Sequence, residues 1–232
     1  MLNHCLHGQF HFTIHCRLIL INNGIILSIQ ASVDTIWKET ERHGRQLGNM
    51  NAIYNTQGKI SIIYPSDTTA SAYYQAVALD LSRNIFQYFG ADTEIIRSNR
   101  EHQADKGNVV YLGFPEVSTA HSETRFPIIL DENNDLVLVL HDGYEKKFRS
   151  ETGIGAIFVI PLEGSERVGI VIWGSDEDNF RRAMRLFPLR TGVGQPDFII
   201  LGPESAQKGI AGALALGFFD SEWQITRYSF FR

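Results

Sequence analysis

The sequence predicts an α/β fold with three layers, built around a doubly wound, mostly parallel but mixed sheet. Three observations predict it. Short β-branched runs alternate with helical segments from residue 58 onward. The connections between the first strands are long enough to hold a helix, as parallel pairing requires. The chain has 232 residues, of which 44% are hydrophobic and 20% charged, so it can bury a substantial core.

The first elements form a strand–helix–strand unit. Lys59–Tyr64 is a β-branched run that predicts a strand, and Pro65 begins a turn after it. The helix expected over Thr68–Phe89 has its apolar residues on one stripe, and Gly90 stands where a helix takes its left-handed stop. Two further strands are expected, at Thr93–Arg97 and Asn108–Gly113.

The middle of the chain predicts two antiparallel pairs, which make the sheet mixed. Phe126–Leu130 and Asp135–His141 flank a polar turn, a pattern that indicates a hairpin. A second pair is expected from Ile154–Pro161 and Arg167–Trp173.

The last part of the chain returns to alternation. A helix is expected over Asp176–Phe187, a buried strand over Asp197–Leu201 and a helix of small residues over Glu204–Leu216. Glu222–Phe231 alternates weakly and predicts a closing strand. This order of elements is typical of flavodoxin-like and Rossmann-like domains.

The composition breaks near residue 30. Residues 1–30 contain one charged side chain, Arg17, and four of the eight histidines. We therefore expect an atypical N-terminal extension at residues 1–30, a connecting segment at 31–57 and a single α/β domain at 58–232. The extension lacks the basic start of a convincing secretory signal, and its apolar run is too short to span a membrane.

The extension also carries both cysteines. Because Cys5 and Cys16 both lie in the extension, the domain at 58–232 can have neither a disulfide of its own nor a thiolate nucleophile. His7, His11 and His15 recur every four residues, the spacing of a helical metal site, but the residues around them favour a strand, on which they would not converge. We therefore expect no metal.

The junctions that follow the parallel strands are the candidate ligand site. Ligands of open α/β sheets bind beyond the carboxyl ends of these strands. The candidate residues at that edge are Ser66, Asp67, Gly113, Glu116, Gly174, Ser175, Asp176, Gly202 and Glu204. Lys208 is the only cation near them in the sequence, so the edge suits a small neutral or cationic ligand better than a polyphosphate.

The charge and the motifs exclude several classes of partner. The net charge of -5 and the isoelectric point near 5.9 argue against a nucleic-acid partner. A dinucleotide-binding motif follows a strand and begins a helix, whereas Gly153 and Gly155 precede a strand. The segment 202–208 has the length of a P-loop, but Gln207 stands where glycine is required. We expect no cofactor.

The serines and carboxylates of the edge have a structural interpretation. Ser175 is expected to be an N-cap with Asp178 at the third helical position, an arrangement that stabilises a helix without any ligand. The chain has no G-x-S-x-G elbow, and His141 and Asp142 are adjacent, so their side chains point to opposite faces of a strand. Ser205 is likewise expected at a cap or turn. No catalytic residue is assigned.

Asp131, Asn133 and Asp135 copy the first ligand spacings of a calcium loop. Leu136 occupies the position that requires glycine, and Asp142 would have to replace the closing glutamate. A polar hairpin turn therefore explains these residues better than a calcium site.

Three segments resemble a known group of proteins: Arg45–Ile53, Ala78–Ile96 and Gly155–Gly202. They are similar to the C-terminal region of large secreted fungal proteins whose upstream part is an esterase- or peptidase-like α/β-hydrolase. The resemblance covers residues 45–232 and implies a flavodoxin-like accessory domain without catalytic residues of its own. It implies secretion as well.

Two classes of function follow from these expectations. The first is a non-catalytic accessory or interaction domain, associated with a hydrolase-type protein, that packs against a partner domain or holds a small ligand at the acidic edge. The second is a hydrolase that uses edge carboxylates, such as Asp67 with Asp176, or the edge serines. A small-molecule-binding regulator is a further alternative.

Overall fold

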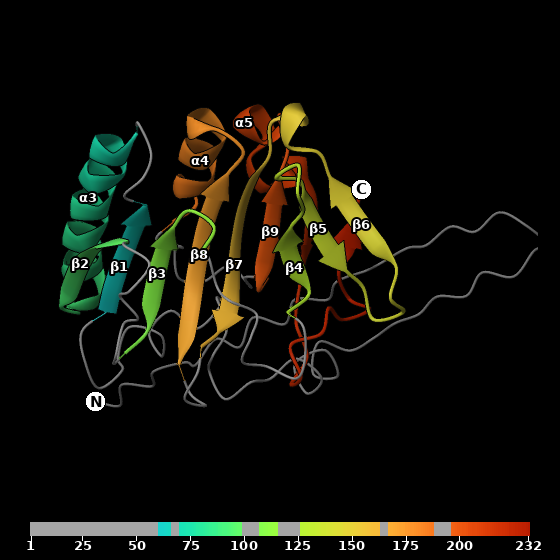
Figure 1. The fold of residues 1–232 in the computed structure, drawn as a ribbon, viewed down its shortest axis with the longest axis horizontal. Helices are drawn as coiled ribbons and strands as arrows, with labels where there is room; N and C mark the ends of the chain where they lie inside the picture. Colours follow the sequence, from blue (N-terminus) through green and yellow to red (C-terminus); the bar gives the residue numbers. More distant parts are fainter. Residues whose placement is uncertain (1–59, 66–69, 99–106, 116–125, 163–166, 188–195) are drawn as a thin grey trace, which may run out of the picture.

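A computed structural model of the chain describes residues 60–65, 70–98, 107–115, 126–162, 167–187 and 196–232. Its main sheet consists of β1 (Ile60–Pro65), β2 (Thr93–Ser98), β3 (Val109–Leu112), β7 (Gly155–Pro161), β8 (Val168–Gly174), β9 (Phe198–Leu201), β10 (Ala213–Gly217) and β11 (Phe230–Phe231). The strands lie in the order β11-β10-β9-β7-β8-β3-β1-β2 (Figure 1).

One half of this sheet is parallel. β1 pairs in parallel with β2 and β3, and β3 pairs in parallel with β8. The helix α3 (Ser71–Phe89) connects β1 to β2 and buries Ala78, Leu81 and Ile85. Gly90 ends it in the left-handed conformation, with φ 64°, as the sequence predicts.

The other half is antiparallel. β7 lies antiparallel to both β8 and β9, so β8 and β9 run in the same direction. The helix α4 (Glu177–Met184) follows β8, and the single-turn helix α5 (Ser205–Lys208) follows β9. The antiparallel pairing of β7 with β8 confirms the strand pair predicted from Ile154–Pro161 and Arg167–Trp173.

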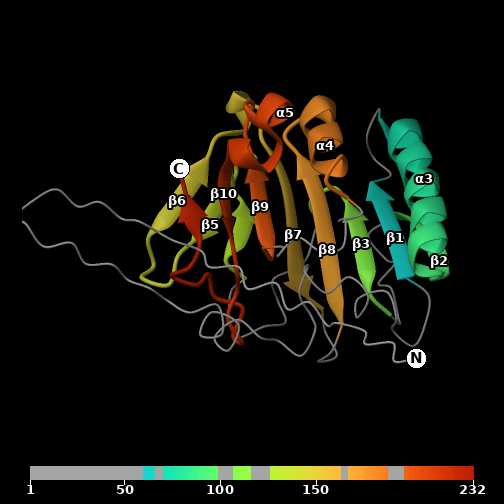
Figure 2. The ribbon, with the colours of Figure 1, turned by 180° about the vertical axis from the view of Figure 1, so that it is seen from behind.

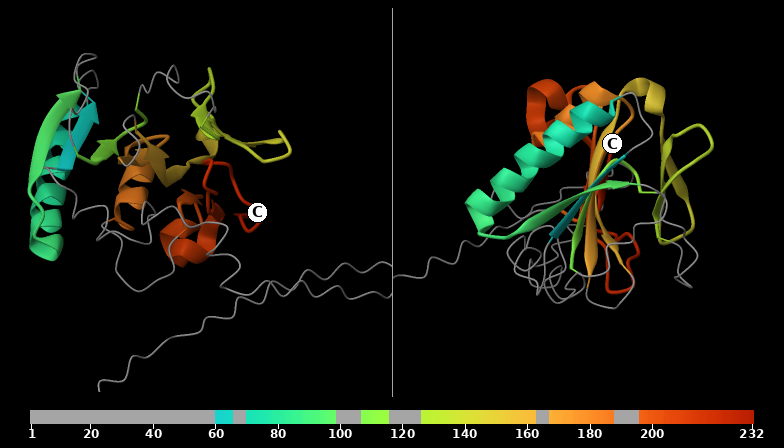
Figure 3. Two further views of the ribbon diagram at one scale, coloured as in Figure 1. Left: turned by 90° about the horizontal axis from the view of Figure 1, so that it is seen from below. Right: turned by 60° about the vertical axis from the view of Figure 1, so that its left-hand side comes forward.

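A second, smaller sheet covers the face of the main sheet that lies opposite the helices. It consists of β4 (Ile128–Leu130), β5 (Leu136–Val139) and β6 (Glu145–Phe148), and a 3₁₀ turn over Ser150–Thr152 follows it. Figure 3 shows α3, α4 and α5 on one face of the main sheet and this small sheet on the other. Phe158 of β7 lies between the layers with its ring against Phe114 and Phe126, at centroid distances of 5.7 and 6.2 Å.

The helix expected over Glu204–Leu216 is confirmed only for its first turn, α5, and is wrong for its end, which forms β10. After α5 the chain makes a 3₁₀ turn over Gly209–Gly212 and then enters β10 (Figure 2). Ala213 and Ala215 are buried while Leu214 between them is partly exposed, which is the two-residue period of a strand. Pairing with β9 and β11 provides the hydrogen bonds that outweigh the helical preference of alanine and leucine.

Two other elements differ from expectation. The closing strand predicted over Glu222–Phe231 is reduced to β11, because the preceding residues form turns. β6 was not anticipated, although the dipeptide Asp142–Gly143 between β5 and β6 is a strong hairpin signal.

The structure bears out part of the predicted fold class. The chain has an α/β fold with a large mixed sheet and few helices. In the described part, helices cover one face only, so the doubly wound, three-layer arrangement is not confirmed. The N-terminal extension at residues 1–30 and the connecting segment at 31–57 lie outside the described residues. None of the described helices combines the length and the apolar character needed to cross a bilayer.

Candidate functional site at the carboxyl edge of the sheet

The fold brings several predicted junctions to one edge. β1, β3, β8 and β9 all run in the same direction, so their carboxyl ends lie together at the upper edge in Figure 1. Of the nine candidate residues, six are described there: Gly113, Gly174, Ser175, Asp176, Gly202 and Glu204. Ser66, Asp67 and Glu116 lie outside the described residues. The structure therefore gives no distance between Asp67 and Asp176, the carboxylates considered as a catalytic pair.

The junction after β8 is built around the cap of α4. Asp176 has an extended backbone, and its Oδ1 accepts a hydrogen bond from the Asn179 backbone N–H at 2.8 Å. The N-cap is therefore Asp176 and not Ser175. The aspartate serves as cap because its side chain is the one placed to reach the third helical N–H. This carboxylate also accepts the Asn179 Nδ2 at 2.7 Å.

Ser175 instead joins the strand β7 to α4. Its Oγ accepts the backbone N–H of Ile154 and the Nδ2 of Asn179, both at 3.2 Å. Its own backbone N–H donates to the Ile154 carbonyl at 2.9 Å. The hydroxyl oxygen thus has two internal donors, which fix it as a structural acceptor.

Glycine sets how closely α4 approaches the sheet. A Cβ at Gly174 would lie 2.0 Å from the backbone N of Phe180, and one at Gly155 would lie 2.6 Å from the carbonyl oxygen of Asn179. Only glycine permits this approach, because the obstructing atoms belong to the backbone of the helix. Gly113, at the end of β3, has φ 125° and donates its N–H to the Ile172 carbonyl at 2.8 Å.

The junction after β9 is held by cations. Glu204 accepts from Lys208 at 3.1 Å and from the C-terminal residue Arg232 at 2.9 Å. These two partners, Lys208 first, lower the pKa of the Glu204 carboxyl below its ordinary value. The Gly202 carbonyl accepts from Arg182 of α4 at 3.2 Å.

The edge is therefore less acidic than the sequence suggested. Lys208 was expected to be its only cation, but Arg182 and Arg232 also reach it. Arg182 was recognisable as part of a basic helical turn, whereas nothing in the local sequence relates Arg232 to Glu204, which lies 28 residues earlier.

Two buried polar atoms of this edge lack a partner among the described residues. They are the Oδ1 of Asn179 and the Oγ of Ser205, in residues that are 4% and 7% exposed. The Asn179 amide is held by Asp176 and is not a nucleophile, and no described contact places a histidine or carboxylate against the Ser205 hydroxyl. The geometry supports close packing of α4 and α5 on the sheet more directly than attack on a substrate.

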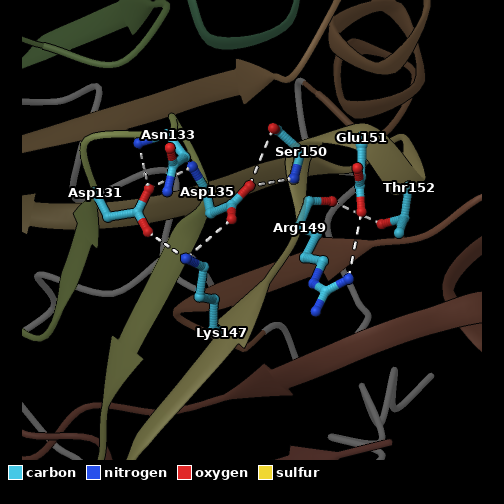
Figure 4. Close-up of polar contacts among 8 residues, drawn as sticks. All are labelled: Asp131, Asn133, Asp135, Lys147, Arg149, Ser150, Glu151 and Thr152. Carbon is cyan, nitrogen blue, oxygen red and sulfur yellow. Dashed lines mark hydrogen bonds and ion pairs between the residues drawn. The ribbon is translucent and has the colours of Figure 1, made fainter.

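A second polar cluster lies in the small sheet (Figure 4). Lys147 of β6 places its Nζ between Asp131 and Asp135, at 2.5 Å from the first and 3.1 Å from the second carboxylate. Asp135 also accepts the backbone N–H of Ser150 at 2.7 Å and its hydroxyl at 3.0 Å. Asp131 accepts the backbone N–H of Asn133, which closes the turn.

This cluster explains the calcium-like spacing. The ammonium group of Lys147 takes the position between the carboxylates, and the turn follows the hairpin interpretation. Lys147 lowers the pKa of Asp131, while the Ser150 N–H is the main cause of the lowered pKa of Asp135. In the described part of the chain, no three His, Cys, Asp or Glu side chains are grouped to hold a metal ion.

Comparison with known proteins gives one informative relative. No family model matches the chain. An uncharacterized secreted protein of Arthroderma benhamiae is 34% identical over 198 residues, which cover 82% of this chain and 20% of that protein. The chain thus spans about a fifth of the length of this relative. A likeness to a much longer secreted fungal protein agrees with the coarse part of the resemblance stated from the sequence.

Proposed function

We propose that this chain is a non-catalytic α/β module that packs against a partner domain in a secreted, hydrolase-type protein. One observation carries the proposal: the described carboxylates of the carboxyl edge, and the Ser175 hydroxyl beside them, are occupied by partners within the module. Asp176 caps α4, Ser175 joins β7 to α4, and Glu204 is paired with Lys208 and Arg232. An edge built this way stabilises the fold and leaves its described carboxylates little capacity for acid–base chemistry.

Two further observations support the proposal. The order β2-β1-β3-β8 matches the strand order 2-1-3-4 of a flavodoxin-like sheet, which supports the fold that the resemblance implies. The relative of Arthroderma benhamiae is secreted and much longer than this chain, as expected if the module is one part of a larger protein.

An activity assay tests the absence of catalysis. The purified chain is incubated with p-nitrophenyl esters and short peptides, and separately with a fluorophosphonate probe followed by intact-mass measurement. We expect neither turnover nor labelling. Turnover that is lost in Ser66→Ala, Ser175→Ala or Ser205→Ala, or in Asp67→Asn combined with Asp176→Asn, would establish the hydrolase instead.

A thermal shift measurement tests the alternative of a small-molecule-binding regulator. A nucleotide that binds the native state raises the Tm, and the rise grows with the logarithm of the nucleotide concentration above the Kd. We expect the Tm to be unchanged at saturating ATP, ADP or FMN, and a concentration-dependent rise with any of them would favour the regulator.

A further inference from the structure

We draw no further inference here: the strongest candidate, the pair of buried side-chain oxygens formed by the Asn179 Oδ1 on α4 and the Ser205 Oγ on α5, belongs to the carboxyl-edge site already described, and nothing in the described residues shows what the two atoms would bind.

Discussion

At the scale of single residues, the N-cap of α4 shows that a side chain predicted at a ligand site can instead bind the backbone of a helix. Ser175 and Asp176 are both good cap residues, and they sit next to each other where a ligand site was expected. Their roles are divided by backbone conformation: Asp176 has φ -149° and ψ -179°, which aims its carboxylate at Asn179, while Ser175 faces Ile154.

The cap predicts a measurable loss of stability. Asp176→Ala removes the acceptor of the Asn179 N–H and should lower the free energy of unfolding by about 0.5–2 kcal/mol, as other N-cap deletions do. Urea unfolding followed by circular dichroism measures it. Asp176→Asn keeps the acceptor and should recover most of the loss, and Asp178→Ala, which removes an exposed carboxylate in the same turn, is the control. A loss equal in Asp178→Ala would contradict the assignment of the cap.

At the scale of elements, the small sheet depends on the charge cluster at its turn. Asp135 is 8% exposed, and its carboxylate connects Lys147 of β6 to the 3₁₀ turn through Ser150. Because Lys147 also holds Asp131, one ammonium group connects both sides of the hairpin. A buried carboxylate keeps its charge only with such partners.

This cluster predicts an acid-sensitive sheet. The pKa values of Asp131 and Asp135 are lowered in the folded state, so their contribution to stability is complete above the ordinary carboxyl pKa of about 3.9 and is lost as the pH falls through the lowered values. Lys147→Met should lower the Tm at pH 7, and its Tm should fall less than that of the wild type as the pH is lowered, because the pKa values of the two carboxyl groups are then less depressed in the folded state.

Thermal unfolding between pH 7 and pH 2 measures this difference. The two Tm curves should converge at the acidic end, where both carboxyl groups are protonated in either protein. Lys146→Met, one residue earlier on β6, is the control and should follow the wild-type curve. Parallel curves for Lys147→Met and the wild type would show that the cluster does not couple to folding.

At the scale of the whole molecule, the aromatic layer joins the main sheet to the small sheet. Phe158 is 1% exposed and lies on β7, in the antiparallel half. Its ring meets Phe114, which follows the parallel strand β3, and Phe126, which precedes the small sheet. The packing of one side chain therefore connects all three parts of the described fold.

Truncation of this ring should affect the molecule as a unit. Phe158→Ala is expected to cost about 3–5 kcal/mol of unfolding free energy, the range for large-to-small changes of buried aromatic residues. Phe86→Ala removes the same ring from the exposed side of α3 and should stay within about 0.5 kcal/mol of the wild type in the isolated chain. Guanidinium unfolding followed by fluorescence and circular dichroism compares both variants. A loss below about 1 kcal/mol for Phe158→Ala, roughly the contribution of one buried methylene group, would contradict the joining role.

The sequence by itself determined the elements whose signal is local. Hydrophobic period and capping depend on neighbours along the chain, so elements with such signals were recognisable. These elements are the strands β1, β3, β7, β8 and β9, the helix α3 with its stop at Gly90, and the helix that follows Ser175. The local sequence also identified nine candidate residues of the carboxyl edge, six of which the structure describes at that edge.

Only the tertiary structure decided what depends on distant partners. Ala213–Gly217 has helical composition but became β10, since β9 and β11 supply its hydrogen bonds. Arg232 meets Glu204 because β11 pairs with β10 and β10 with β9, an order that no local pattern encodes. The physical reason is that hydrogen-bond ladders and ion pairs across a sheet are fixed by which strands lie side by side, and this order is a property of the whole chain.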